Sequence, residues 1–258
     1  MLRTNKFFYD NGFTVEIAVT PRCNLACPYC ENRIQESYSC SDLDLDTAAD
    51  FILRSFLGKK LTVILNGGEP TLNHKLKKFC LNLSKYKDIT IILYTNLQAE
   101  PELYRELSVS GVVIKPTFHS GDPLWFRSKL TVSGIDAAVL IPCSDDSISN
   151  MDTLKNIFKN IELVLLENKN YSLNEIIMLS KIDKRIIDQF TVLKKAGNKK
   201  DTVRRCGSRY IYIDENGDVC QCVFLLQQRA LGNIFDSSYA YKDLGEFMCP
   251  YGKCFYDI

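Results

Sequence analysis

Cysteine is the residue type whose number and spacing point most directly to chemistry in this chain. The 258 residues include eleven cysteines, an odd number that cannot pair completely into disulfides within one chain. The N-terminal segment lacks the apolar core of a signal peptide, so we expect a cytoplasmic protein whose reduced thiols bind metal. The cysteines gather near the two ends and indicate two metal centres: Cys23, Cys27 and Cys30, then Cys206, Cys220, Cys222, Cys249 and Cys254.

The first group forms a C-x3-C-x2-C pattern. Three thiolates within eight residues suit three irons of a [4Fe–4S] cluster and leave the fourth iron for an outside ligand. A structural zinc site is the alternative from these residues alone, but such a site takes four ligands and only Cys40 follows nearby. The pattern therefore favours a cluster with one open iron.

A second motif, NGGEPT, occupies residues 66–71. Gly67 and Gly68 let the backbone approach a ligand closely, and Glu69 offers a carboxylate to an ammonium group. An ordinary strand-to-helix turn is the alternative, because Gly and Pro are common in turns. The motif becomes specific evidence for a ligand site because it ends the next predicted strand after the one that precedes the cysteines.

Short apolar runs alternate with helical patterns over residues 13–167, as expected for a parallel α/β sheet. There are too few units for a closed eight-stranded barrel, so we expect a six-unit partial barrel or an open sheet. Both motifs then lie at the carboxyl ends of strands, where such barrels build their active sites. The predicted strands are 13–20, 61–66, 90–96, 112–118, 136–142 and 162–167, and the predicted helices are 45–57, 73–86, 100–108, 122–130 and 151–160.

The pattern changes after Glu167. A polar stretch leads into a predicted helix at residues 183–196, and two alternating runs around Asn216-Gly217 predict a β-hairpin. Cys220 and Cys222 are two residues apart on the second run, so they face the same side of that strand. We therefore predict two domains, residues 1–182 and a small cysteine-rich domain at residues 183–258.

Charge and hydropathy exclude two classes of partner. Lysine and arginine total 32 against 31 acidic residues, so the net charge is +1 and gives no electrostatic reason to expect a dedicated nucleic-acid binder. No segment approaches the ~18–20 apolar residues needed to cross a bilayer. We expect neither a nucleic-acid nor a membrane partner.

The C-x3-C-x2-C segment, with Tyr29 before its third cysteine, and the GGEP motif one strand later together resemble the radical S-adenosylmethionine (radical SAM) superfamily. The resemblance implies a partial (β/α)6 barrel and a [4Fe–4S] cluster on Cys23, Cys27 and Cys30, with SAM at its open iron. An electron from a donor such as flavodoxin or ferredoxin then releases a 5′-deoxyadenosyl radical, which abstracts hydrogen from a substrate. The residues expected to contact SAM are Tyr29, Gly67, Gly68, Glu69, Pro70 and His119; for His119 an inert polar strand end is the alternative.

The C-terminal part resembles the twitch domain, the single-cluster relative of the SPASM domain. The resemblance rests on the C-x10-G-x4-C run from Cys206 through Gly217 to Cys222. It implies an auxiliary [4Fe–4S] cluster, with Cys220 as a substitute ligand or a free thiol nearby. Zinc is the alternative, because four thiolates also suit that ion. The ligands expected for the auxiliary cluster are Cys206, Cys222, Cys249 and Cys254.

The last fifth of the chain is most similar to peptide-modifying members, through CGSRY at 206–210 and IDENGDVCQC at 213–222. The expected substrate is therefore a ribosomal precursor peptide, changed by epimerisation or crosslinking. A small-molecule dehydrogenase acting on a sugar or cyclitol alcohol is the alternative, and a non-catalytic iron–sulfur or zinc protein is a remote one. An epimerase must return a hydrogen atom, and we expect Cys143, at the end of the fifth strand, or Cys220 to donate it. Cys80 is expected to pack inside a helix.

Overall fold

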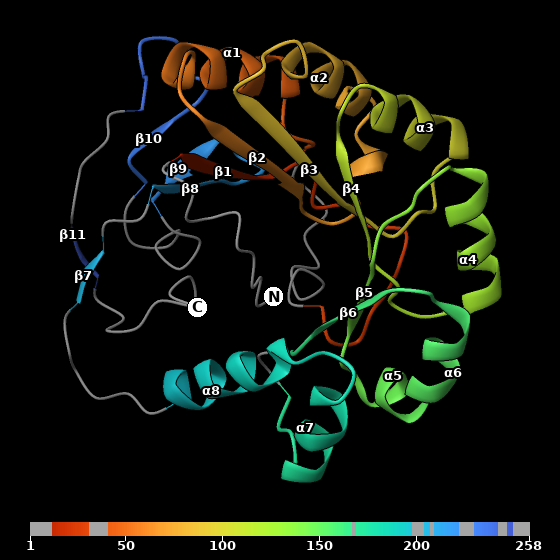
Figure 1. Ribbon diagram of the computed structural model, residues 1–258. Helices are drawn as coiled ribbons and strands as arrows, with labels where there is room; N and C mark the ends of the chain where they lie inside the picture. Colours follow the sequence, from red (N-terminus) through yellow and green to blue (C-terminus); the bar gives the residue numbers. More distant parts are fainter. Residues whose placement is uncertain are drawn as a thin grey trace.

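The computed structural model describes residues 12–30, 41–166, 169–197, 204–206, 209–221, 230–241 and 247–249. Within these residues, six parallel strands follow one another in chain order around an arc (Figure 1). A bridge between Thr117 and Leu140 joins the first four strands to the last two. The predicted parallel α/β fold is confirmed. The strands are β1 (Phe13–Ala18), β2 (Leu61–Asn66), β3 (Ile89–Thr95), β4 (Val113–Pro116), β5 (Val139–Pro142) and β6 (Ile161–Val164).

Helices lie on the outside of the arc, and the five predicted helices of the first part are present (Figure 1). Two helices were not predicted. One of them, α7, begins at a capping box in which Ser172 and Glu175 bind each other's backbone N–H, a signal that the S-x-x-E spacing carries. The helices are α1 (Leu45–Phe56), α2 (Leu76–Leu83), α3 (Pro101–Val109), α4 (Pro123–Val132), α5 (Asp145–Ser149), α6 (Met151–Ile157), α7 (Leu173–Ser180) and α8 (Arg185–Gly197), with a 3₁₀ turn, η3, at Pro70–Leu72.

Alternate strand residues face opposite sides of the arc. Val15 and Ile17 of β1 join the main hydrophobic core, which lies between the strands and the helices. A smaller apolar group lines the inner side: Ile64, Ile92, Tyr94, Leu140 and Val164. This alternation decides which residues beyond each strand end point into the arc.

Side chains complete the outer edge of β6. Gln189 of α8 is 1% exposed; its Oε1 accepts the N–H of Leu165 at 2.9 Å, and its Nε2 donates to the carbonyl of Leu163 at 3.0 Å. The Asp183 carboxylate accepts the N–H of Leu163 at 3.0 Å. A buried backbone group without a partner costs about 1–3 kcal/mol, so α8 replaces a neighbouring strand and ends the sheet after β6.

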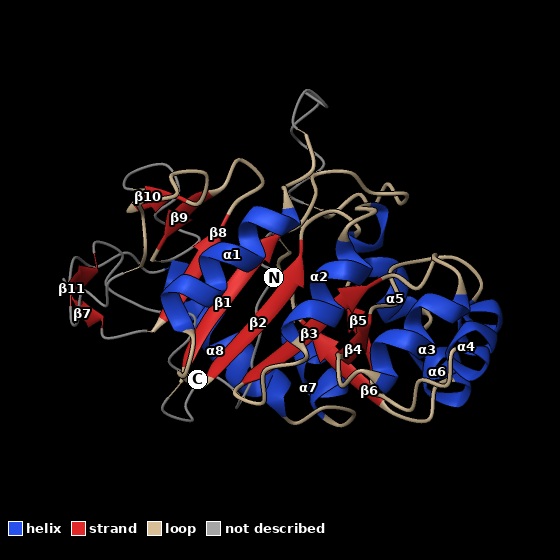
Figure 2. Cartoon of the chain, turned by 90° about the horizontal axis from the view of Figure 1, so that it is seen from above, coloured by secondary structure: helices blue, strands red, loops and turns tan. Residues whose placement is uncertain are grey.

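A hairpin completes the other edge. The strand β8 (Tyr210–Ile213) pairs in parallel with β1, and β9 (Asp218–Cys220) and β10 (Gly232–Asn233) follow outward (Figure 2). The predicted hairpin is confirmed, with Gly217 at φ +80° in its turn. The hairpin therefore extends the sheet of the first part, although the sequence placed it in a second domain. A separate pair is formed by β7 (Arg204–Cys206) and β11 (Phe247–Cys249).

Helix α1 fixes the segment that follows the hairpin. Arg54 donates to the carbonyl of Tyr239 at 2.9 Å and to that of Ile234 at 3.0 Å. The ring of Tyr239 stacks on Phe51 with centroids 5.8 Å apart.

None of the described helices combines the length and the apolar character that crossing a bilayer requires.

Candidate active site

The cysteine-bearing loop leaves β1 alongside the chain that leaves β2. The amide of Gly68 donates to the carbonyl of Thr20 at 2.7 Å, and the amide of Glu69 donates to the carbonyl of Arg22 at 2.7 Å. These bonds continue the parallel ladder beyond both strands, up to the residue before Cys23. We call this contact the backbone clamp.

The clamp explains the two glycines. A Cβ atom at Gly68 would lie 2.0 Å from the Arg22 carbonyl oxygen, and one at Gly67 would lie 2.5 Å from that of Thr20. Gly67 also has φ +125°, which is strained for any other residue. The sequence predicted that the glycines admit a ligand; in the structure, the backbone that approaches them is that of the cysteine loop.

Arg22 attaches the base of the loop to two other segments. Its guanidinium donates to both carboxylate oxygens of Asp42 and to the carbonyl of Leu72 at 2.7 Å. Thr20 also donates to Asp42, at 2.6 Å. Burial opposes ionisation of Asp42, but the hydrogen bonds from Arg22 and Thr20 prevail and lower its pKa. Sequence reasoning missed this group, because Arg22 and Asp42 are twenty residues apart and form no local pattern.

The three cysteines of the loop are accessible. Cys23 is exposed, Cys27 and Cys30 are half-buried, and the amide of Cys30 donates to the carbonyl of Cys27 at 3.1 Å. Burial raises the pKa of the Cys23 and Cys27 thiols, so ligation by metal must offset the cost of deprotonation. In the described part of the chain, no three His, Cys, Asp or Glu side chains are arranged to hold a single metal ion. A [4Fe–4S] cluster with one open iron instead needs one thiolate on each of its other three irons, and three accessible thiols on one loop fit that requirement.

Tyr29 and His119 connect the loop to the end of β4. The Tyr29 hydroxyl lies 3.0 Å from His119 Nδ1, and the two rings stack with centroids 6.1 Å apart. Burial lowers the pKa of His119 to about 4, so the imidazole is neutral at pH 7. The sequence placed His119 on the same rim as the cysteines, and the structure brings it against Tyr29.

Glu69 is buried, with 2% of its surface exposed. Its carboxylate accepts hydrogen bonds from Thr71, Thr95 and the amide of Asn96. Asn96 in turn donates to Asn24 of the cysteine loop, with Nδ2 2.7 Å from Oδ1. The loop is thus connected to the ends of β2, β3 and β4.

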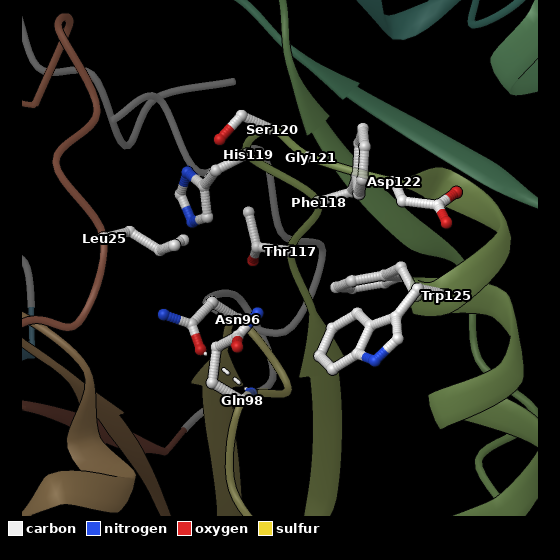
Figure 3. A pocket seen from close by; sticks show the side chains of 11 residues that line it. Leu25, Asn96, Gln98, Thr117, Phe118, His119, Ser120, Gly121, Asp122 and Trp125 are labelled. Atoms are coloured by element: carbon white, nitrogen blue, oxygen red, sulfur yellow. Dashed lines mark hydrogen bonds between the residues drawn. The ribbon is translucent and has the colours of Figure 1, made fainter.

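A pocket of about 240 Å³ opens beside the loop, over the ends of β3 and β4 (Figure 3). Leu25 and His119 form one side, and Trp125 of α4 lies on the opposite side. Asn96 and Gln98 provide amide groups at its lower edge in this view. The mixture of apolar walls and a few polar groups is typical of a small-molecule site.

The structure does not place Cys143 on the rim. Its side chain is fully buried in the core between strands and helices, with Sγ 3.9 Å from the Ile141 carbonyl oxygen, and burial raises its pKa to about 12. This position corrects the expectation that Cys143 reaches a substrate, because Cys143 continues the helix-facing side of β5. Cys80 packs inside α2 as predicted.

The expected ligands of the auxiliary cluster are described only in part. Cys206 of β7 and Cys249 of β11 lie on paired strands, where Phe247 is opposite Cys206 and Cys249 is opposite Arg204. Cys220 is buried on β9, opposite Tyr212, and burial together with Asp214 and Asp218 raises its pKa to about 11. Cys222 and Cys254, like Cys40, lie outside the described residues.

The backbone clamp generates a prediction for Gly68→Ala. The new Cβ atom would meet the Arg22 carbonyl, so we expect the cysteine loop to move and the iron content of the reconstituted protein to fall. Gly134→Ala is the control: it has φ +67° with open space around it, and we expect a loss of about 1–2 kcal/mol in unfolding free energy with iron retained. Iron analysis and urea unfolding measure both variants. Equal iron content in the two would contradict the clamp.

Comparison with known proteins agrees with this geometry. The model of the radical SAM superfamily matches residues 17–179. GTP 3′,8-cyclase of Helicobacter pylori is 23% identical over 228 residues, which are 87% of this chain and 63% of that enzyme. The corresponding enzyme of Clostridium acetobutylicum is 33% identical over 106 residues, 38% of this chain and 31% of that one. The chain thus spans less than two thirds of the length of these curated relatives.

Solved structures share the fold. SuiB of Streptococcus suis bound to S-adenosylmethionine has a TM-score of 0.64 at 16% identity, covering 88% of this chain and 64% of that one. The enzyme anSMEcpe with bound AdoMet has a TM-score of 0.60 at 17% identity, covering 86% and 78%. BtrN in complex with AdoMet and 2-DOIA has a TM-score of 0.53 at 19% identity, covering 88% and 79%. Because the family model matches more than half of the residues, the chain belongs to the radical SAM superfamily.

Proposed function

We propose that Cys23, Cys27 and Cys30 hold a [4Fe–4S] cluster whose fourth iron is left for SAM. The observation that carries this proposal is the backbone clamp, which fixes the start of the cysteine loop against the GGEP segment. When bound, the cluster and SAM supply a 5′-deoxyadenosyl radical that takes a hydrogen atom from the substrate. The protein orients these groups and shields them from water.

The pocket beside the loop is proposed as part of the SAM site. Its position between Leu25 and α4 puts it beside the loop that carries the three cysteines, and its polar residues include Asn96 and His119. A neutral His119, bonded to Tyr29, presents an apolar ring face and adds no charge next to a sulfonium. The Tyr29–His119 contact thereby fixes one wall of the pocket relative to the cysteines.

An auxiliary [4Fe–4S] cluster on Cys206, Cys222, Cys249 and Cys254 remains a proposal. The pairing of β7 with β11 supports it, because it brings the backbones of Cys206 and Cys249 onto neighbouring strands.

Cys220 of β9 is paired across the sheet with Tyr212 of β8, which is in turn paired with Glu16 of β1. We propose Cys220 as the hydrogen-atom donor if the reaction is an epimerisation; turnover in heavy water that leaves no deuterium on the substrate carbon would contradict this.

For the substrate we propose a polypeptide, with GTP as the second candidate. The peptide proposal comes from the sequence of the last fifth, and the fold relatives anSMEcpe and SuiB have been solved with peptides bound. The curated relatives favour GTP. Among the described strand residues that face the inside of the arc, however, Lys115 is the one cation, and its Nζ lies 3.4 Å from Glu162. A single lysine that already faces a carboxylate gives this wall little positive charge to attract a triphosphate, so the described wall suits an uncharged chain better.

The first prediction for this function concerns iron and SAM. Anaerobic reconstitution should give about eight irons per chain, and alanine at Cys23, Cys27 and Cys30 should halve that number, because each cluster holds four irons. The triple variant should also form no 5′-deoxyadenosine from SAM under reducing conditions. Cys80→Ala, which removes a buried thiol of α2, is the control and should keep the cleavage. A triple variant that still cleaves SAM would contradict the proposed function, and about four irons plus zinc in the unaltered chain would contradict the auxiliary cluster alone.

The second prediction separates the two substrate candidates with GTP as the probe. If the substrate is a polypeptide, GTP should not raise the rate of 5′-deoxyadenosine formation above the rate without substrate. Liquid chromatography with mass detection measures both 5′-deoxyadenosine and remaining GTP. GTP consumption in step with SAM cleavage would contradict the peptide proposal and establish the second candidate.

A further inference from the structure

The cysteine loop makes a tight turn between Cys27 and Cys30. The amide of Cys30 donates to the carbonyl of Cys27 at 3.1 Å, which closes the turn around Pro28 and Tyr29. The turn holds Tyr29 between two of the three cysteines of the site. Tyr29 is half-buried, so the contacts of its side chain are partly shielded from water.

The Tyr29 hydroxyl has two side-chain partners. Its oxygen lies 3.0 Å from Nδ1 of His119. It also forms a hydrogen bond with the Cys27 thiol: burial raises the pKa of that thiol, and the bond with Tyr29 opposes the rise. A phenol has a single O–H, so it donates to one partner at a time. In the other contact the oxygen must accept.

The chemistry of the two partners decides the direction of each bond. A cysteine that ligates metal is a thiolate, and hydrogen bonds to an ionised acceptor are about twice as strong as neutral ones. Burial lowers the pKa of His119 to about 4, so at pH 7 the imidazole is neutral and has one N–H, which it can carry on Nδ1. The favoured arrangement has His119 donating to the Tyr29 oxygen and Tyr29 donating to the sulfur of Cys27.

We propose that the Tyr29 hydroxyl donates a hydrogen bond to the cluster-binding sulfur of Cys27, and that His119 is a positioning residue that holds the hydroxyl in this direction. This inference rests on the proposed function, since it concerns the cluster of the same loop. Hydrogen bonds to the sulfurs help to set the reduction potential of an iron–sulfur cluster. A donor stabilises the more negative, reduced state, so the Tyr29–His119 pair raises the potential.

Tyr29→Phe tests the hydroxyl, because it removes the O–H and keeps the ring. A redox titration of the iron-loaded chain, followed by electron paramagnetic resonance, measures the midpoint potential of the cluster whose signal changes when SAM is added. We expect the equilibrium constant of one-electron reduction to fall about tenfold, which lowers the potential by about 59 mV. Tyr86→Phe, at a partly exposed position before β3, is the matched control and should leave the potential unchanged. Equal potentials in the two variants would overturn the proposal.

His119→Phe tests the positioning role, because it keeps an aromatic ring beside Tyr29 and removes the nitrogen that contacts the hydroxyl. We expect the equilibrium constant of reduction to fall about threefold when Tyr29 is present, and not to fall further in a chain that already carries Tyr29→Phe. If His119 acts only on the general structure of the rim, its replacement should have the same effect in both backgrounds. That result would overturn the positioning role.

Failure of this inference and failure of the proposed function give different results. If Tyr29→Phe does not retain iron, the potential of His119→Phe, which keeps the hydroxyl, decides: a lower value supports the proposal and an unchanged value overturns it. An unaltered chain that binds neither iron nor SAM contradicts the proposed function itself, whereas every potential is measured in a chain that holds both.

Discussion

The site depends on one physical constraint, the close contact between the backbones that leave β1 and β2. Amide–carbonyl bonds from Gly68 to Thr20 and from Glu69 to Arg22 require the two chains to approach more closely than any side chain at residue 68 permits. The glycines therefore serve the fold first. By fixing the residue before Cys23, they give the loop a defined starting point, and contacts with Asn96 and His119 determine its further course.

Hydrogen bonds complete both edges of the parallel arc, and those at β1 connect the C-terminal part to the site. At β6, the side chains of Asp183 and Gln189 take the place of a neighbouring strand. At β1, the hairpin strand β8 occupies the edge, and Tyr210 donates to the carboxylate of Glu16 on the inner side. Asn66, the residue before the glycines, donates to the same carboxylate. The C-terminal part is thus hydrogen-bonded to the strand from which the cysteine loop leaves.

Much of the fold could be predicted because short apolar runs and helix caps are local signals. Residues 61–66 coincide with β2, and Asp44, directly before the predicted helix at 45–57, caps α1 by accepting the amide of Asp46. Side-chain direction was harder to predict. The run AAVLIP at 137–142 is continuously apolar, so it does not reveal which face meets the helices, and a shift of one residue reverses the face. Cys143 was expected on the rim because it follows the end of this strand, and the structure places it in the core.

The roles within the motifs were also beyond local reasoning. Glu69 is conspicuous in sequence as a carboxylate beside two glycines. Its partners Thr95 and Asn96, however, are 26 and 27 residues away along the chain. The pairing of Arg22 with Asp42 and of Tyr29 with His119 depends in the same way on strand ends meeting at one edge. Sequence patterns pointed to the residues that we propose for the chemistry, whereas the residues that hold them in place required the three-dimensional arrangement.

The central claim is that the fold itself holds the base of the cysteine loop before any cluster binds. Hydrogen exchange of the Gly68 and Glu69 amides in iron-free protein tests this directly, because both amides donate across the backbone clamp. Exposed Gly121, in the loop before α4, provides the fast reference. The account predicts slow exchange of both amides without iron and little further change when iron is added. Exchange as fast as that of Gly121 without iron, slowing only on reconstitution, would show that the cluster orders the loop and would contradict the account.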